Sequence, residues 1–420
     1  MPDYAIYKTK NTSAILNDMI FDIYYAWYEE GKAWFTGKRR NYIFCADIRK
    51  KEINIIGKLP GNQYRNYSKV IKIGSKLICL PCAEKDIIIY NLETGTYKRV
   101  VIKNCGEVLR IYCSDIGVLD GKLYFMIINL RRIVALDVVK EEIASLYDIG
   151  CCSAEEGIGY KSELYEHKIY IPVANENKVI VFDIKSKEYK EQHIEGDISG
   201  IGWICRDGDC LWLVGFSYGI VRWDINTGKI SSAKEFPEDF KLYNVIRRKN
   251  RRELEWYLYS EKKEIISDDA KFFCWDCVCN KENIWNITSG SDSIIRVNAK
   301  TMIADVIKLV DVKDVILQAY EFVLLGLDSD NHIFVFSRRN HELYNINCDT
   351  LEYCTESWNI TPEAIRILVE DWFEKTTYEG LFDGLKEFFF CLLNTNSDRE
   401  GDKVYSTVGT QIYKQTESCI

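Results

Sequence analysis

The chain has 420 residues, of which 47% are hydrophobic and 28% charged, so it can bury a substantial core. With only 6 prolines and 25 glycines, its composition excludes a collagen-like or disordered chain. The net charge of −8 argues against a nucleic-acid-binding protein, and no apolar stretch approaches the roughly 18 residues that a membrane span requires.

The N-terminal sequence and the cysteines indicate the compartment. No basic segment followed by an apolar run opens the chain, so we expect no secretory signal. The 16 cysteines lie mostly inside apolar runs, where a thiol behaves as a small hydrophobic side chain. Disulfide-dense proteins are usually short and secreted, so the sequence predicts reduced, buried thiols and a cytoplasmic protein.

A repeated pattern organises most of the chain. Each copy reads as a turn, an apolar strand, a polar hairpin tip, a second apolar strand ending in Asp or Asn, another turn and a third strand. The seven copies span residues 31–56, 75–102, 121–147, 167–194, 209–236, 282–309 and 331–356.

The register of the repeat can be checked by counting from an aromatic or aliphatic residue in the first strand of each copy. These markers are Trp34, Ile78, Tyr124, Tyr170, Trp212, Trp285 and Phe334. The second strands then end at Asp47, Asn91, Asp137, Asp183, Asp224, Asn298 and Asn347. The separation is 13 residues in six copies and 12 in the fifth, an offset that chance would not preserve seven times.

A further apolar strand precedes each copy, as in residues 68–73, which gives four strands per repeat of about 45 residues. These repeats resemble the kelch-like and YVTN-like β-propeller superfamily, although the kelch glycine doublet and the Trp-Asp ending of WD40 repeats are missing from most copies. The resemblance implies an all-β fold, a seven-bladed propeller of four-stranded antiparallel blades, within residues 1–360. It does not imply one function, because propellers support many.

Two regions interrupt the repeat. An insertion near residues 238–270, with the basic run Arg247–Arg252, separates the fifth and sixth blades and is either a solvated excursion or a contact for an anion or partner. Thr361 and Pro362 are suited to start a helix, and residues 361–395 carry apolar side chains at helical spacing, so we expect a C-terminal helical extension. The tail, 396–420, or the N-terminal segment around Tyr4 could supply a strand that closes the ring.

In the propeller family, ligands usually bind over the central channel, on the face that carries the hairpin between the second and third strands. The residue nine before each marker falls early in the innermost strand. These residues are Tyr25, Lys69, Asp115, Lys161, Trp203, Asp276 and Leu325. We expect the first six to ring the channel mouth as a ligand-binding site. The alternative is a water-filled channel whose charges compensate one another.

Five of the seven hairpin tips carry a cation, including Arg40, Arg132 and Arg339. Clustered on one face, they would favour phosphate or carboxylate, because Arg offers a bidentate fork. The alternative is that tips are polar only because they are solvated. The fifth and sixth tips, around Phe216 and Ser291, are less basic and could form a sector lined with aromatic side chains.

Metal and cofactor motifs are weak. Cys274 and Cys277 form a Cys-x-x-Cys pair with no second pair at zinc-finger spacing, and strict alternation along a strand would place Cys277 and Cys279 opposite Cys274. The four histidines do not cluster in the repeat register, which counts against metal-dependent hydrolases and lyases. We therefore expect no metal and no cofactor.

The sequence favours a non-catalytic binding module or scaffold that presents its channel face to a protein partner or to an anionic or sugar-containing ligand. The alternative is a carbohydrate-active enzyme that uses Asp115 and Asp276 for acid–base chemistry, with Lys69 and Lys161 holding an anionic group. A structural subunit that docks through its C-terminal helices is a third possibility.

Overall fold

The computed structural model of the chain describes residues 23–37, 41–61, 66–103, 111–153, 156–216, 219–234, 236–237, 245–250, 253–258, 274–280, 282–288, 291–310, 317–318, 322–338 and 341–376. Almost all of these residues belong to β-strands or to the turns between them. The prediction of an all-β fold is therefore confirmed.

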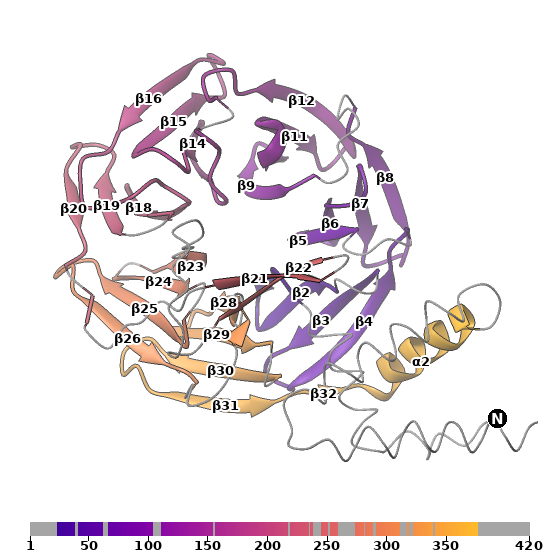
Figure 1. Cartoon of the computed structure of the whole chain (residues 1–420). Coiled ribbons are helices and arrows are strands. Elements are labelled where there is room, and N and C mark those ends of the chain that lie inside the picture. Colours follow the sequence, from indigo (N-terminus) through magenta and orange to yellow (C-terminus); the bar gives the residue numbers. More distant parts are fainter. Residues whose placement is uncertain are drawn as a thin grey trace, which may run out of the picture. The chain divides into compact units, whose positions relative to one another are not determined.

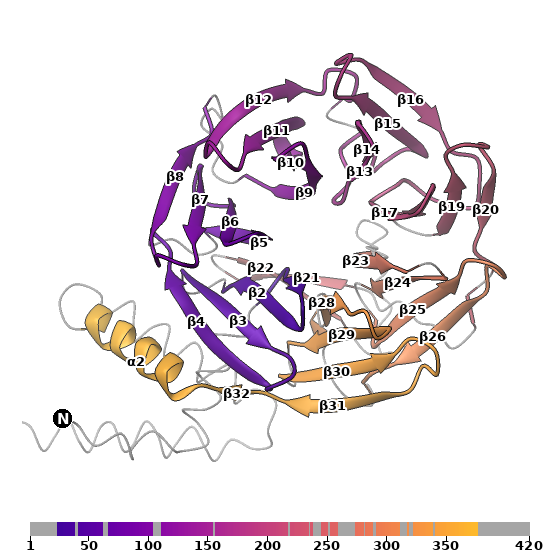
Figure 2. The same ribbon diagram turned by 180° about the vertical axis from the view of Figure 1, so that it is seen from behind.

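The strands form seven four-stranded antiparallel blades arranged in a ring (Figures 1 and 2). Blades one to three contain β1 (Trp27–Glu29), β2 (Lys32–Thr36), β3 (Tyr42–Asp47), β4 (Glu52–Lys58); β5 (Tyr67–Ile73), β6 (Lys76–Pro81), β7 (Asp86–Asn91), β8 (Tyr97–Val101); and β9 (Cys113–Leu119), β10 (Lys122–Ile127), β11 (Arg132–Asp137), β12 (Glu142–Asp148). Blades four and five contain β13 (Glu163–Tyr165), β14 (Lys168–Pro172), β15 (Lys178–Asp183), β16 (Tyr189–His193); and β17 (Trp203–Asp207), β18 (Cys210–Val214), β19 (Ile220–Asp224), β20 (Ile230–Ser232). Blades six and seven contain β23 (Cys274–Cys279), β24 (Asn283–Thr288), β25 (Ser293–Asn298), β26 (Ala304–Lys308); and β28 (Phe322–Leu327), β29 (His332–Ser337), β30 (Glu342–Asn347), β31 (Tyr353–Ser357).

The second strand of each repeat copy is the third strand of a blade, and the turn that follows it has a local physical cause. The side-chain oxygen of the terminal Asp or Asn accepts hydrogen bonds from backbone N–H groups two or three residues later, which fixes the turn to the outer strand. In blade six, Asn298 Oδ1 accepts from Lys300 N at 3.0 Å and from Thr301 N at 3.1 Å. Equivalent bonds occur at Asp47, Asn91, Asp137, Asp183, Asp224 and Asn347. The predicted register is therefore correct in all seven blades.

The buried side chains lie between neighbouring blades. One cluster joins Ile78 and Ile89 of blade two to Phe125 and Val134 of blade three, and similar clusters are shared by other neighbouring blades. Both faces of most middle strands are buried, as their continuous apolar sequences predicted. A blade cannot bury two apolar faces by itself, so the ring is the unit that stabilises each sheet.

Blade one takes all four of its strands from residues 27–58, and β32 (Asn359–Ile360) adds to its outer edge by pairing in parallel with β4. Asn359 N donates to Lys51 O at 2.8 Å, and Thr361 N donates to Ile53 O at 3.1 Å. The chain thus returns to its first blade after completing the seventh. The two segments that we expected to close the ring, around Tyr4 and in residues 396–420, lie outside the described residues.

The insertion between blades five and six contains a hairpin of β21 (Val245–Asn250) and β22 (Glu253–Leu258), extended by β27 (Leu317–Gln318) into a three-stranded sheet. Only three residues separate β27 from β28, the innermost strand of blade seven. The three-stranded sheet is therefore linked in sequence to the first residue of that strand. Figure 1 shows β21 and β22 extending across the ring.

A helix, α2 (Pro362–Thr376), follows β32 and begins at the proline that the sequence indicated. It belongs to a different compact unit from the blades. The second predicted apolar set, residues 381–392, lies outside the described residues. No helix in the described part of the chain is long and apolar enough to cross a membrane.

Candidate functional site

Four inner strands change register within their length. Pairing shifts between Tyr67 and Lys69 in β5, between Asp115 and Gly117 in β9, between Cys274 and Asp276 in β23, and between Leu324 and Gly326 in β28. A bulge leaves one residue unpaired and redirects the side chains beside it. Because these shifts recur in four of the inner strands, the side chains of those strands do not follow strict alternation.

Lys69 and Asp115 form an ion pair between the inner strands of blades two and three. Both side chains are largely buried, with 12% and 21% of their surfaces exposed. The Lys69 ammonium also lies 5.0 Å from the centre of the Tyr25 ring, where a cation is attracted to the aromatic face. Burial alone would raise the pKa of Asp115, but the charge and hydrogen bond of Lys69 outweigh it and lower this pKa.

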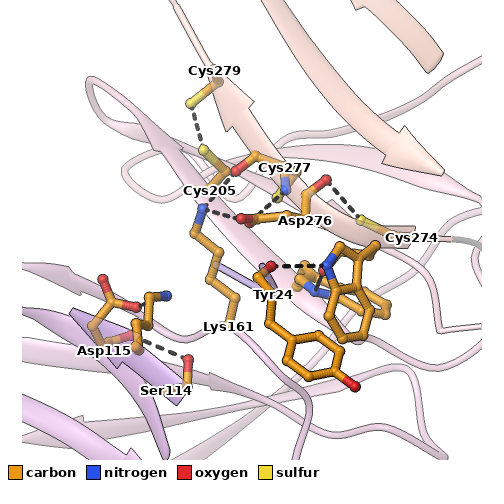
Figure 3. A network of polar contacts seen from close by, with 12 residues as sticks. Tyr24, Ser114, Asp115, Lys161, Cys205, Cys274, Asp276, Cys277 and Cys279 are labelled. Carbon is orange, nitrogen blue, oxygen red and sulfur yellow. Dashed lines mark hydrogen bonds and ion pairs between the residues drawn. The ribbon is translucent and has the colours of Figure 1, made fainter. Parts of the chain in front are cut away.

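Lys161 forms the second ion pair and links blades four and six. Its Nζ lies 3.4 Å from Asp276 Oδ1 and donates a hydrogen bond of 2.5 Å to Cys277 O (Figure 3). Burial opposes the charged ammonium, but Asp276 and further negative neighbours, Asp115 among them, raise the pKa of Lys161 well above its usual value. The four predicted charged residues thus form two compensated Lys–Asp pairs.

Aromatic side chains border these ion pairs. Tyr25 stacks on Trp275 with ring centres 5.3 Å apart, and Trp203 Nε1 donates to Trp275 O at 3.1 Å. Tyr160 and Phe216 stack on Trp203 at 5.4 Å and 6.3 Å. We define the aromatic wall as Tyr24, Tyr25, Tyr160, Trp203, Phe216 and Trp275. All except the buried Trp203 are partly exposed, so the wall offers ring surface beside the two ion pairs.

The structure therefore brings together Tyr25, Lys69, Asp115, Lys161, Trp203 and Asp276, the six predicted residues of the channel mouth. Arg132 is directed elsewhere: its Nε donates to Asp148 Oδ1 at 2.6 Å, across to the outer strand of the same blade. Arg40 and Arg339 lie outside the described residues. Of the two less basic tips, Phe216 of the fifth is part of the aromatic wall, and residues 217–218 and 289–290 lie outside the described residues.

Sequence reasoning missed Trp275 and Glu163. Strict alternation assigned Trp275 to the side opposite Asp276, and only the bulge at this residue, which no local sequence signal marks, allows it to stack on Tyr25. Glu163 opens β13, two residues after Lys161. Burial raises the pKa of Glu163 to about 8, and the nearby Cys205 contributes in the same direction. The signal that could have identified Glu163 is its position two residues after Lys161, which the sequence predicted as a site residue.

The cysteines of β23 also depart from the prediction. We expected Cys277 and Cys279 opposite Cys274, but the bulge reverses the alternation, and all three pack in or against one cluster between blades five and six. That prediction was wrong. Cys205 of β17 faces them, and its Sγ lies 2.9 Å from Cys279 Sγ (Figure 3). Across the described ranges, no three His, Cys, Asp or Glu side chains are arranged to hold a metal ion.

Two of the four histidines, His167 and His332, lie away from these ion pairs. His167, in the turn before β14, pairs with Asp183 at 3.2 Å, and His332, which opens β29, contacts Asn345 at 2.7 Å. Both contacts are at the end of a blade where the first and second strands are connected. The inner-strand residues described above lie at the other end, where the inner strands begin.

Comparison with known proteins supports the fold. No family model and no curated protein sequence matches the chain. Among solved structures, a streptogramin B lyase is 15% identical, with a TM-score of 0.54, and the match covers 76% of this chain and 92% of that chain. A catalytically inactive virginiamycin B lyase from Staphylococcus aureus with quinupristin is 15% identical, with a TM-score of 0.51, and the match covers 75% of this chain and 91% of that chain. The chain is thus similar in fold to these seven-bladed β-propellers, and the narrower resemblance to kelch-like repeats stays a prediction.

Proposed function

We propose that this protein is a non-catalytic binding module whose ligand contains a sugar and contacts the aromatic wall at the channel mouth. The observation that carries this proposal is the partly exposed stack of Tyr25 and Trp275 beside two Lys–Asp pairs. A sugar ring has apolar C–H faces that pack on aromatic rings, and its hydroxyl groups both donate and accept hydrogen bonds. Carboxylates accept and ammonium groups donate, so the adjoining ion pairs match both roles.

The charge balance favours a neutral ligand over an anionic one. Lys69 and Lys161 are both paired with carboxylates, so a phosphate or carboxylate ligand would have to compete with Asp115 and Asp276 for them. Arg132 is also engaged, by Asp148. A protein partner is also compatible with aromatic side chains at a surface, but two ion pairs beside stacked rings are better suited to the mixed polar and apolar surface of a sugar. We also propose that the chain is related to the kelch-like propellers and that it is a cytoplasmic protein.

The proposal is tested by measuring the melting temperature of the full chain against a panel of neutral oligosaccharides, sugar phosphates and peptides. A ligand that binds only the folded state raises the melting temperature by an amount that grows with the ratio of its concentration to its Kd. We expect one or more neutral oligosaccharides to raise it, with sugar phosphates giving no larger shift than the corresponding neutral sugars. A panel in which only peptides raise the melting temperature would overturn the sugar assignment.

A second function, acid–base catalysis on a carbohydrate, is favoured by Glu163. The pKa of Glu163 is raised to about 8 while that of Asp115 is lowered, and two carboxyl groups whose pKa values are pushed apart can divide the roles of acid and base. Under this alternative, Glu163 is the proton donor and Asp115 the base, in place of the Asp115–Asp276 pair that the sequence indicated. Asp276 is engaged by Lys161 and by Cys277 N at 2.8 Å, and Asp115 is likewise engaged by Lys69.

The two functions are distinguished by variants. Glu163→Gln and Asp115→Asn should each abolish turnover of a sugar substrate by an enzyme, while a binder should keep its affinity within a few fold in Glu163→Gln.

The segment Gly215–Gly219 matches the G-x-S-x-G spacing of a nucleophile elbow, but it connects β18 to β19. The elbow of hydrolases joins a strand to a helix, so this spacing does not indicate a serine nucleophile here.

A further inference from the structure

Four cysteines gather where blades five and six meet, and the binding proposal uses none of them. Cys205 comes from the inner strand β17, and Cys274, Cys277 and Cys279 come from the neighbouring inner strand β23. Cys274 and Cys277 are fully buried, Cys205 is 7% exposed, and Cys279 is partly exposed. We call these four residues the thiol cluster.

One contact in the thiol cluster joins the two blades. Cys205 Sγ and Cys279 Sγ are 2.9 Å apart, whereas a disulfide bond is about 2.05 Å long. A movement of roughly one ångström would bring the sulfur atoms to bonding distance. Cys279 Sγ also lies 2.8 Å from Arg206 O, a contact that holds the Cys279 side chain beside the strand that carries Cys205.

The electrostatic surroundings favour the thiolate of Cys205. Hydrogen bonds from Cys277 and Cys279, together with the charge of Lys161, lower the pKa of Cys205 well below its usual value despite burial. The same hydrogen bonds, made by thiols that donate to Cys205, raise the pKa values of Cys277 and Cys279. Within the cluster, Cys205 is therefore the thiol whose proton is lost most readily.

We propose that Cys205 and Cys279 are a redox-reactive pair that a hydroperoxide converts to a disulfide between blades five and six. Cys205 loses its proton, its sulfur attacks the peroxide, and the O–O bond breaks. Cys205 becomes a sulfenic acid, and the departing alkoxide, or hydroxide from hydrogen peroxide, takes up that proton and leaves as an alcohol or as water. The Cys279 sulfur then attacks the Cys205 sulfur, its proton leaves with the hydroxyl group as water, and the S–S bond forms. Two thiols are oxidised, and one peroxide is reduced.

The test uses the full chain, reduced and then freed of reductant. It is exposed to a small excess of hydrogen peroxide at pH 7, quenched with an alkylating reagent, digested without reduction and examined by mass spectrometry. We expect a cross-link between the peptides of Cys205 and Cys279, with loss of both free thiols and full reversal by dithiothreitol. Overoxidation of Cys205 without any cross-link, or a cross-link of Cys205 to Cys277, would overturn the assigned pair.

Three variants complete the test. Cys205→Ser and Cys279→Ser should each lose the cross-link, and Cys210→Ser should keep it, because Cys210 is equally buried in blade five but lies outside the thiol cluster. If either cluster variant fails to fold, the cross-link in the wild-type chain still decides the question. Stoichiometric zinc that remains bound through dialysis and protects all four cysteines would contradict the proposal, since a metal site would then explain the cluster.

Discussion

Gly326 of the last blade lies directly against the side chain of Tyr28 of the first. A Cβ atom added at Gly326 would come within 2.2 Å of Tyr28 Cβ, closer than two carbon atoms can approach without a bond. The Tyr28 ring also packs on Phe334, with ring centres 5.7 Å apart. The contact between the two ends of the ring therefore depends on a position that has no side chain.

This contact predicts a specific stability effect. Gly326→Ala should destabilise the protein by about 1–3 kcal/mol, because the added methyl group must separate blades seven and one. Gly150→Ala is a matched control, since a Cβ at Gly150 would meet nothing within 4 Å and Gly150 does not have a positive φ. Urea denaturation followed by circular dichroism measures both. Equal stability of the two variants would show that the ends of the ring are not packed as described.

The turns that follow each third strand give a second prediction. Asn298→Ala should lower the free energy of unfolding by about 1 kcal/mol, because the backbone N–H groups of Lys300 and Thr301 lose their acceptor. Asn298→Asp keeps an oxygen at the same place, as four other blades do with Asp, and should change the stability much less. The midpoint of urea denaturation distinguishes the variants, and an equal loss in both would contradict the role of the oxygen.

The ion pair of Lys161 gives a third prediction. Lys161→Met should cost about 2 kcal/mol or more, because Asp276 would stay largely buried without its cation. Lys300→Met is the matched control: Lys300 and Glu282 are 79% and 60% exposed, and pairs of this kind contribute about 0–1 kcal/mol. Thermal unfolding of the two variants tests the difference. A Lys161 variant as stable as the control would mean that the channel charges are well solvated.

Glu163 predicts how stability depends on pH. Its pKa in the folded protein, about 8, is above the value of an unperturbed glutamate, so the folded state retains a proton that the unfolded state releases. The contribution is fully present below about pH 4.5 and is lost as the pH rises to about 8. Glu163→Gln should remove this dependence. The expected result is a difference in melting temperature between variant and wild type that changes in favour of the variant from pH 5 to pH 8, and a constant difference would contradict it.

Features that depend on interactions between residues close in sequence could be predicted from the sequence. The Asp or Asn at the end of each third strand makes hydrogen bonds within three residues, so its spacing was readable without the fold. The residues nine before each marker, Lys69 and Asp115 among them, could be predicted because the seven copies share one register. Each of these predictions uses only local sequence and repetition.

The missed features arise between blades or at bulges. Trp275 stacks on Tyr25, which is 250 positions away in the sequence, and reaches it because β23 changes register at that residue. Cys205 meets Cys279 across a blade boundary for the same reason. The ion pairing of the lysines likewise required the arrangement of the blades, and it agrees with the compensating charges that were the alternative expectation for the channel mouth. The spacing of residues within one repeat carries no information about these contacts between blades.

The most direct test of the binding site is a calorimetric titration of the oligosaccharide that gives the largest melting-temperature shift, comparing the wild-type chain with Trp275→Ala. Tyr97→Ala is the control, because Tyr97 is an exposed aromatic residue on the outer strand β8. Loss of the stacking surface should weaken binding at least tenfold, which is about 1.4 kcal/mol, in Trp275→Ala and leave Tyr97→Ala unchanged. Equal affinity in all three proteins would contradict a site on the aromatic wall.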